Sequence, residues 1–181
     1  MLLTEQEQNN IENEVNAFLK SYHFQRTFPL NFTVLAETIG NWKIYYMKQD
    51  ANDIDKIVGI ISPLQKTVLI NPCFKETKQS FLNGRYVLAK LFARFAQGDV
   101  PEKMAWAEFR PELRPNEDKL SNERAANFAC ELLMPVQEFK RQWQLLGKDE
   151  IKLSEYFGVT QRKIIERAMF LGEYQNASNE K

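Results

Sequence analysis

The sequence predicts an α+β fold, because stretches with helical periodicity and stretches with strand periodicity occupy separate blocks of the chain. Residues 4–22 and 32–39 have helical patterns, and residues from about 75 onward are again helical. Between these blocks lie three runs rich in β-branched and aromatic residues, at 42–47, 56–62 and 67–70. We therefore expect N-terminal helices, a small three-stranded sheet and a C-terminal helical group.

The N-terminal block contains one long and one short helix. The apolar residues of the long helix recur at helical spacing and form one face: Ile11, Val15, Phe18, Leu19 and Tyr22. The short helix, 32–39, ends before Gly40, a residue that commonly terminates helices.

The strand block predicts an antiparallel hairpin. The runs 56–62 and 67–70 are joined by only four residues, Pro63-Leu64-Gln65-Lys66, and so short a connection brings two strands side by side in opposite directions.

The helical block contains five predicted helices. The first covers about 75–97, and the others are expected at 120–134, 135–143, 150–157 and 161–171. Ser121 or Asn122 is expected to cap the helix at 120–134.

A chain of 181 residues with 44% hydrophobic residues suits a single core. We predict one domain at 1–172 and a polar tail at 173–181.

Composition excludes several kinds of site and partner. Lysine plus arginine equals aspartate plus glutamate at 24 each, so no net charge favours nucleic acid or an anionic membrane. The single histidine, His23, cannot supply a His-X-X-X-His zinc pair. Cys73 and Cys130 are far apart and are expected to be free thiols, and no apolar run of about 18 residues is present. We expect a soluble, cytoplasmic protein with no membrane segment.

Two segments carry a family resemblance. The first is Tyr86-Val87-Leu88-Ala89-Lys90-Leu91-Phe92-Ala93-Arg94, and the second is Glu123-Arg124-Ala125-Ala126-Asn127-Phe128-Ala129-Cys130-Glu131-Leu132-Leu133-Met134-Pro135. They resemble two motifs of the ImmA/IrrE family of zinc peptidases, roughly Phe-Thr-Leu-Ala-His-Glu-Leu-Gly-His and Glu-X-X-Ala-Asn-X-Phe-Ala-X-X-Leu-Leu-Met-Pro. The second segment is one residue short before Phe128. Weaker similarity at 29–47, 59–71 and 153–172 extends the resemblance over nearly the whole chain, which implies a zincin-like scaffold with an active-site-type helix.

The positions that carry the chemistry of that family are changed. The resemblance implies zinc-binding histidines at Lys90 and Arg94, the general base at Leu91, and a third zinc ligand at Glu123. Lysine and arginine are positively charged near neutral pH and do not bind zinc, and leucine cannot accept a proton. One carboxylate does not hold a catalytic zinc ion. We expect no bound metal, no cofactor and no hydrolytic activity.

Two interpretations of Lys90 and Arg94 are open. If the fold is kept, the two cations lie on one helical face and pair with Glu123, so that an ion pair replaces the metal. Alternatively, both cations lie opposite the apolar stripe of an amphipathic helix and are solvated.

Residues 153–171 have a helix-turn-helix pattern with Arg162, Lys163 and Arg167 on the second helix. In a DNA-binding protein such cations contact phosphates or guanines. Residues 150–181 nevertheless carry five basic and five acidic groups, which favours packing into the core.

Trp106, Phe109 and Arg110 are expected on a loop that crosses near the former cleft. Exposed aromatic residues there would bind a partner peptide, and anchoring of the loop to the core is the alternative.

These observations predict a non-catalytic peptidase-like module that acts by binding another protein. Active members of the family typically cleave or antagonise helix-turn-helix repressors of phages and mobile elements, so the resemblance implies such a regulator, or a peptide from it, as the partner. Two alternatives stay open: a DNA-binding regulator acting through 153–171, and a metallopeptidase with a displaced site.

Overall fold

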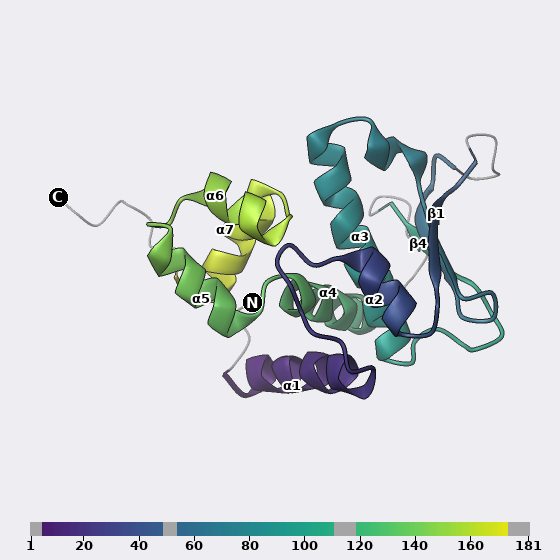
Figure 1. Cartoon of the computed structure of the whole chain (residues 1–181), viewed down its shortest axis with the longest axis horizontal. Helices are drawn as coiled ribbons and strands as arrows, with labels where there is room; N and C mark the ends of the chain where they lie inside the picture. The colour runs from purple at the N-terminus through teal and green to yellow at the C-terminus, as the bar shows by residue number, and fades with distance from the viewer. Residues whose placement is uncertain (1–4, 49–53, 111–118, 174–181) are drawn as a thin grey trace.

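The computed structural model describes residues 5–48, 54–110 and 119–173. Within these residues, seven α-helices and one four-stranded mixed sheet form an α+β fold, which confirms the predicted class. The sheet lies at one end of the molecule, helices α5 to α7 lie at the other, and α3 and α4 lie between them (Figure 1). Most of the predicted polar tail, from residue 174 onward, lies outside the described residues.

The N-terminal helices are α1 (Glu5–Ser21) and α2 (Phe32–Thr38). Helix α1 packs along α4, and α2 lies beside the sheet at the first strand (Figure 1). The side chain of Asn31 caps α2 by accepting hydrogen bonds from the backbone N–H groups of Thr33 and Val34.

The sheet contains β1 (Lys43–Tyr46), β2 (Ile57–Ser62), β3 (Thr67–Ile70) and β4 (Trp106–Phe109), in the spatial order β1-β3-β2-β4. Strands β2 and β3 form the predicted antiparallel hairpin, and β1 runs parallel to β3. Strand β4 pairs antiparallel with β2. The prediction of three strands, with a loop at residues 106–110, is therefore wrong.

The helical block begins with a short 3-10 helix, η1 (Pro72–Lys75), and the long helix α3 (Lys78–Ala96) follows it. The predicted start at residue 75 was too early, because the side chain of Thr77 accepts a hydrogen bond from the N–H of Ser80 and caps α3 there. The remaining helices are α4 (Lys119–Leu133), α5 (Val136–Leu145), α6 (Glu150–Phe157) and α7 (Gln161–Phe170).

Helix α3 runs through the centre of the core. Phe92 is fully buried, and its ring lies 6.1 Å from the ring of Phe32 and 6.3 Å from that of Trp42. These contacts join α3 to α2 and to the residue that precedes β1. The central position of α3 explains why any polar group on its inner face needs a partner from a neighbouring element. In the parts of the chain described above, no helix is both long and apolar enough to cross a membrane.

Candidate functional site

Lys90 and Arg94 lie one turn apart on α3, and both are buried. Their exposed fractions are 4% for Lys90 and 0% for Arg94. The interpretation that they are solvated cations is therefore wrong: β4 and α4 cover the face of α3 on which they lie. Two positive charges inside a protein require compensating groups, and each of the two has them.

The ammonium of Lys90 joins three elements of the fold. Its Nζ atom lies 2.5 Å from Oε1 of Glu108 on β4 and donates a hydrogen bond of 2.8 Å to Oδ1 of Asn122 on α4. Glu108 is as deeply buried as Lys90. The short, charge-assisted contact neutralises both groups where water cannot reach them.

The guanidinium of Arg94 makes a second set of contacts one turn later. Its Nη1 atom donates to Oδ2 of Asp99 at 3.1 Å and to the hydroxyl of Ser121 on α4. Ser121 in turn donates to the same carboxylate oxygen at 2.9 Å, and the guanidinium lies over the ring of Trp106, 5.1 Å from its centroid. Lys90, Arg94 and Glu108 are buried, and Asp99, Ser121 and Asn122 are half-buried around them. We call these six residues the buried polar cluster.

Glu123 is not part of the buried polar cluster. Its side chain is 57% exposed, and its ion-pair partner among the described residues is Lys119, at 3.9 Å between Nζ and Oε1. The predicted pairing of Lys90 and Arg94 with Glu123 is therefore wrong, because Glu108 and Asp99 take that role. Ser121 and Asn122, which were expected to cap α4, lie inside the helix and face α3.

The rotation of α4 explains the error at Glu123. Successive residues of an α-helix point about 100° apart, so neighbours in sequence face different sides. Asn122, one residue before Glu123, faces α3 and contacts Lys90 directly, whereas the side chain of Glu123 faces solvent.

Leu91 lies beside Lys90 on α3 and belongs to the hydrophobic core. The residue is fully buried and packs on β2, where a Cβ atom added to Gly59 would lie 2.7 Å from Cδ1 of Leu91. Glycine at position 59 thus allows the close approach of α3 to the sheet. The side chain of Leu91 offers no group that accepts a proton.

The residues at this place do not fit a zinc ion. An ammonium, a guanidinium, an amide and a hydroxyl surround the two carboxylates of the buried polar cluster, and zinc sites use thiolate, imidazole and carboxylate ligands. In the part of the chain that the structure describes, no three histidine, cysteine, aspartate or glutamate residues come together to hold a metal.

Trp106, Phe109 and Arg110 belong to β4 and its end rather than to a loop. Trp106 packs against the core and over Arg94, which agrees with the alternative that it anchors this segment. Phe109 pairs with Ile57 across the two strands, and the backbone N–H of Arg110 donates to the backbone carbonyl of Lys56 at 2.9 Å. All three side chains are half-buried, because pairing with β2 holds the segment against the molecule.

Helices α6 and α7 form the predicted helix-turn-helix pattern, but its cations are engaged within the protein. Arg167 is buried and donates to Glu131 and to the backbone carbonyl of Met134. Burial raises the pKa of Glu131, and the charge of Arg167 opposes that rise. A DNA contact for Arg167 is therefore wrong.

The two other cations of this segment contact one carboxylate. Glu166 accepts hydrogen bonds from Arg162 at 2.8 Å and from Lys163 at 2.6 Å. These contacts reduce the positive charge that α7 presents to a nucleic acid.

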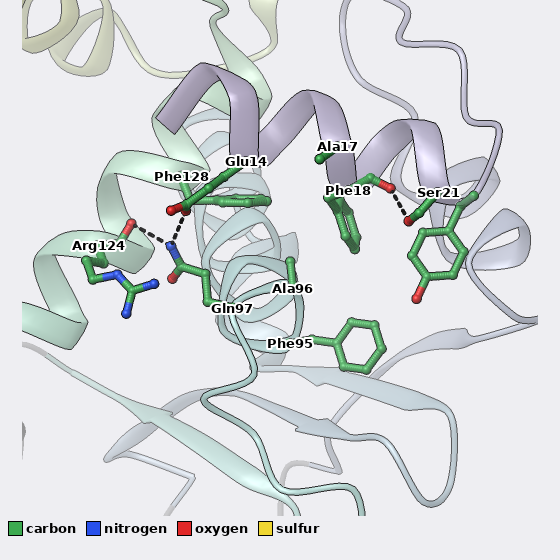
Figure 2. A pocket seen from close by; sticks show the side chains of 10 residues that line it. Glu14, Ala17, Phe18, Ser21, Phe95, Ala96, Gln97, Arg124 and Phe128 are labelled. Carbon is green, nitrogen blue, oxygen red and sulfur yellow. Dashed lines mark hydrogen bonds between the residues drawn. The ribbon is translucent and has the colours of Figure 1, made fainter. Parts of the chain in front are cut away.

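A pocket of about 540 Å³ opens between α1, the end of α3 and α4 (Figure 2). Gln97 lies at its wall, where the side-chain amide donates weakly to Glu14 at 3.4 Å and to the backbone carbonyl of Arg124 at 3.5 Å. Phe18, Phe95 and Phe128 give the pocket an aromatic wall, and Ser21 also lines it. The hydroxyl of Ser21 donates to the backbone carbonyl of Phe18 at 2.8 Å and not to a side-chain base, so the lining does not pair a nucleophile with a base.

No protein-family profile and no curated protein matches this chain.

Proposed function

We propose that this chain is a non-catalytic relative of the ImmA/IrrE zinc peptidases and that it acts by binding another protein. The observation that carries the proposal is the burial of Lys90 and Arg94 between three elements of the fold. These residues occupy two of the three positions at which the resemblance implies zinc ligands. Ligands of one metal ion meet at a common centre from different elements, and the ammonium of Lys90 on α3 meets Glu108 of β4 and Asn122 of α4 in the same way.

The rest of the buried polar cluster supports a replacement of charge by charge. The ammonium of Lys90 supplies a fixed positive charge between α3, β4 and α4, and Glu108 balances it. Arg94 repeats the arrangement with Asp99 and Ser121. In this interpretation the cluster holds α3, β4 and α4 together, as a bound metal ion holds the elements around a zinc site.

Binding rather than hydrolysis follows from the chemistry at the same place. Leu91 cannot take a proton from water, and the side chains of Lys90 and Arg94 do not bind the zinc ion that would activate the water. A peptidase scaffold without these groups retains its surfaces for proteins. From the resemblance we propose a helix-turn-helix regulator, or a peptide derived from one, as the partner.

The experiment combines metal analysis with a peptidase assay on the full chain. After incubation with Zn²⁺ and dialysis, we expect no stoichiometric zinc by mass spectrometry. We also expect no cleavage of casein or of purified helix-turn-helix regulators that chelation by EDTA abolishes. Affinity capture from the native host, with Lys90→Ala and Arg94→Ala variants alongside, then identifies the partner. One tightly bound zinc per chain, or EDTA-sensitive cleavage, would overturn the proposal.

A further inference from the structure

Strand β1 presents one side to the outside of the sheet. The N–H groups of Lys43 and Met47 donate to the carbonyls of Lys66 and Ile70, each at 2.9 Å, on the side of β3. Backbone groups alternate in direction along a strand, so those of Ile44 and Tyr46 point away from β3. Among the described residues no strand pairs with β1 on that outer side. The edge can therefore accept a further strand.

An apolar pocket lies directly beside this edge. It has a volume of about 460 Å³ and opens between β1, the start of α2 and the first half of α3. Tyr46 of β1 and Phe81 of α3 are both substantially exposed at its rim, at 38% and 50%. Further apolar residues line the pocket: Phe32, Ile44, Phe74 and Leu88. A strand added to β1 would direct alternate side chains to this face.

Lysines surround the edge at both ends of β1. Lys43 and Lys66 lie together at its start, because β1 and β3 run parallel and Lys43 pairs with the residue after Lys66. Lys75 lies at its other end, with Nζ 3.8 Å from the centroid of the Tyr46 ring, and Lys48 follows the strand. Within the residues that the structure describes, none of these four lysines forms an ion pair.

We propose that the β1 edge binds an extended acidic peptide segment that carries a large apolar side chain. The segment adds to the sheet through hydrogen bonds with the backbone of Ile44 and Tyr46, its apolar side chain enters the pocket, and its acidic flanks contact the lysines. This inference rests on the proposed protein-binding function and names the surface and the chemistry of the partner. Lysines also protect exposed strand edges from self-association, but that role does not require an open apolar pocket.

The test uses the full chain and a fluorescein-labelled peptide, Glu-Asp-Val-Phe-Val-Asp-Glu, with anisotropy as the readout. We expect saturable binding that weakens with salt. We expect it to weaken about tenfold in a Lys43→Glu/Lys75→Glu variant, because like charges then face each other. Lys140→Glu on α5, at the opposite end of the molecule from the sheet (Figure 1), makes the same change per residue and should leave binding unchanged. Replacing the central Phe of the peptide by Ser should also weaken binding.

A second measurement does not depend on the variants. In two-dimensional ¹H–¹⁵N NMR spectra of the unaltered chain, the amides of Ile44 and Tyr46 should shift on peptide addition and exchange more slowly with deuterium. Equal binding of the basic peptide Lys-Arg-Val-Phe-Val-Arg-Lys would overturn the inference. The absence of peptide binding would do so too, and so would binding of a DNA duplex, but not of the peptide, at these lysines.

The failure of this inference can be told apart from the failure of the proposed function. If a captured host protein binds the Lys43→Glu/Lys75→Glu variant as well as the unaltered chain, the β1 edge is excluded while protein binding stands. Zinc-dependent cleavage contradicts the proposed function whatever the peptide does.

Discussion

The ammonium of Lys90 and the carboxylate of Glu108 form an ion pair inside the protein, with 2.5 Å between Nζ and Oε1 and side chains that are only 5% and 3% exposed. The two residues come from α3 and from β4, 18 positions apart in the sequence. Transfer of each ion out of water costs several kcal/mol, and the opposite charge of the other ion offsets much of that cost. The pair thereby attaches β4 to the central helix.

Removal of one partner should therefore cost much more than removal of both. We expect Lys90→Met to lower the free energy of unfolding by about 3–5 kcal/mol, because the buried carboxylate of Glu108 then loses the ammonium that faces it. Lys90→Met/Glu108→Leu should recover most of that loss. Urea unfolding followed by circular dichroism measures both. Lys119→Met, which removes the exposed pair with Glu123, should change the free energy by less than about 1 kcal/mol. Equal effects of Lys90→Met and Lys119→Met would show that Lys90 is hydrated in solution.

A carboxylate at position 91 should destabilise the fold instead of creating a catalyst. Leu91 is fully buried against β2, and Leu91→Glu would place a charge there without a partner. We expect a loss of about 3 kcal/mol or more, and Leu91→Met, which keeps the volume, should cost less than about 1.5 kcal/mol. Thermal unfolding and a casein assay measure the two consequences. A Leu91→Glu protein as stable as the unaltered chain would mean that water reaches this position.

The helical blocks and the hairpin could be predicted from the sequence because their signals are local. Thr67–Ile70 and Glu150–Phe157 have the predicted bounds, and each depends on residue type and on turn residues nearby. Strand β4 had no such signal. Residues 106–109 lie between Pro101 and Pro111 and include the charged Glu108, so they do not have a strand pattern. The strand forms because β2 supplies its hydrogen bonds and Lys90 supplies a counter-charge for Glu108.

Only part of the candidate site could be predicted, because its contacts join segments that are apart in the sequence. The resemblance indicated Lys90 and Arg94, and both lie at the centre of the buried polar cluster. Their partners could not be inferred, because Glu108 and Asp99 reach them only through the tertiary arrangement. The error at Glu123 depended on a shift of one residue, which turns a helical side chain from the interior to solvent.

The C-terminal helices contain a carboxylate whose titration should make the fold sensitive to acid. Hydrogen bonds from Arg141, at 2.9 and 2.7 Å, and from Tyr156 and Gln142 lower the pKa of Glu138 from its usual 4.5 to about 2. The folded state thus favours the charged form. Its contribution to stability is complete above about pH 4.5 and is lost as the pH falls toward 2.

Glu138→Gln should remove this part of the acid sensitivity. We expect the urea midpoint of the unaltered chain to fall between pH 4.5 and 2 more steeply than that of the variant. Carboxyl ¹³C NMR of the folded protein gives the pKa of Glu138 directly. Glu150→Gln, at the start of α6, is the control and should leave the pH dependence unchanged. A Glu138 pKa near 4.5 would contradict the hydrogen-bonded arrangement.

The register of α4 against α3 can be tested by building a zinc site between them. Three substitutions, Lys90→His, Arg94→His and Asn122→Glu, place zinc-binding groups on side chains of α3 and α4 that face each other. Glu108 contacts the side chain at position 90 and could itself bind the metal, so Glu108→Gln is added throughout. We expect this variant to bind one Zn²⁺ per chain, measured by competition with a chromophoric chelator. The matched variant that keeps Asn122 should bind at least about tenfold more weakly, because one of the zinc ligands is missing and even the loss of a hydrogen-bond partner of a ligand costs that much. Neither should hydrolyse peptides, since Leu91 remains. If Asn122→Glu adds no affinity and Glu123→Gln instead removes the zinc, α4 is rotated by one residue from the arrangement seen here.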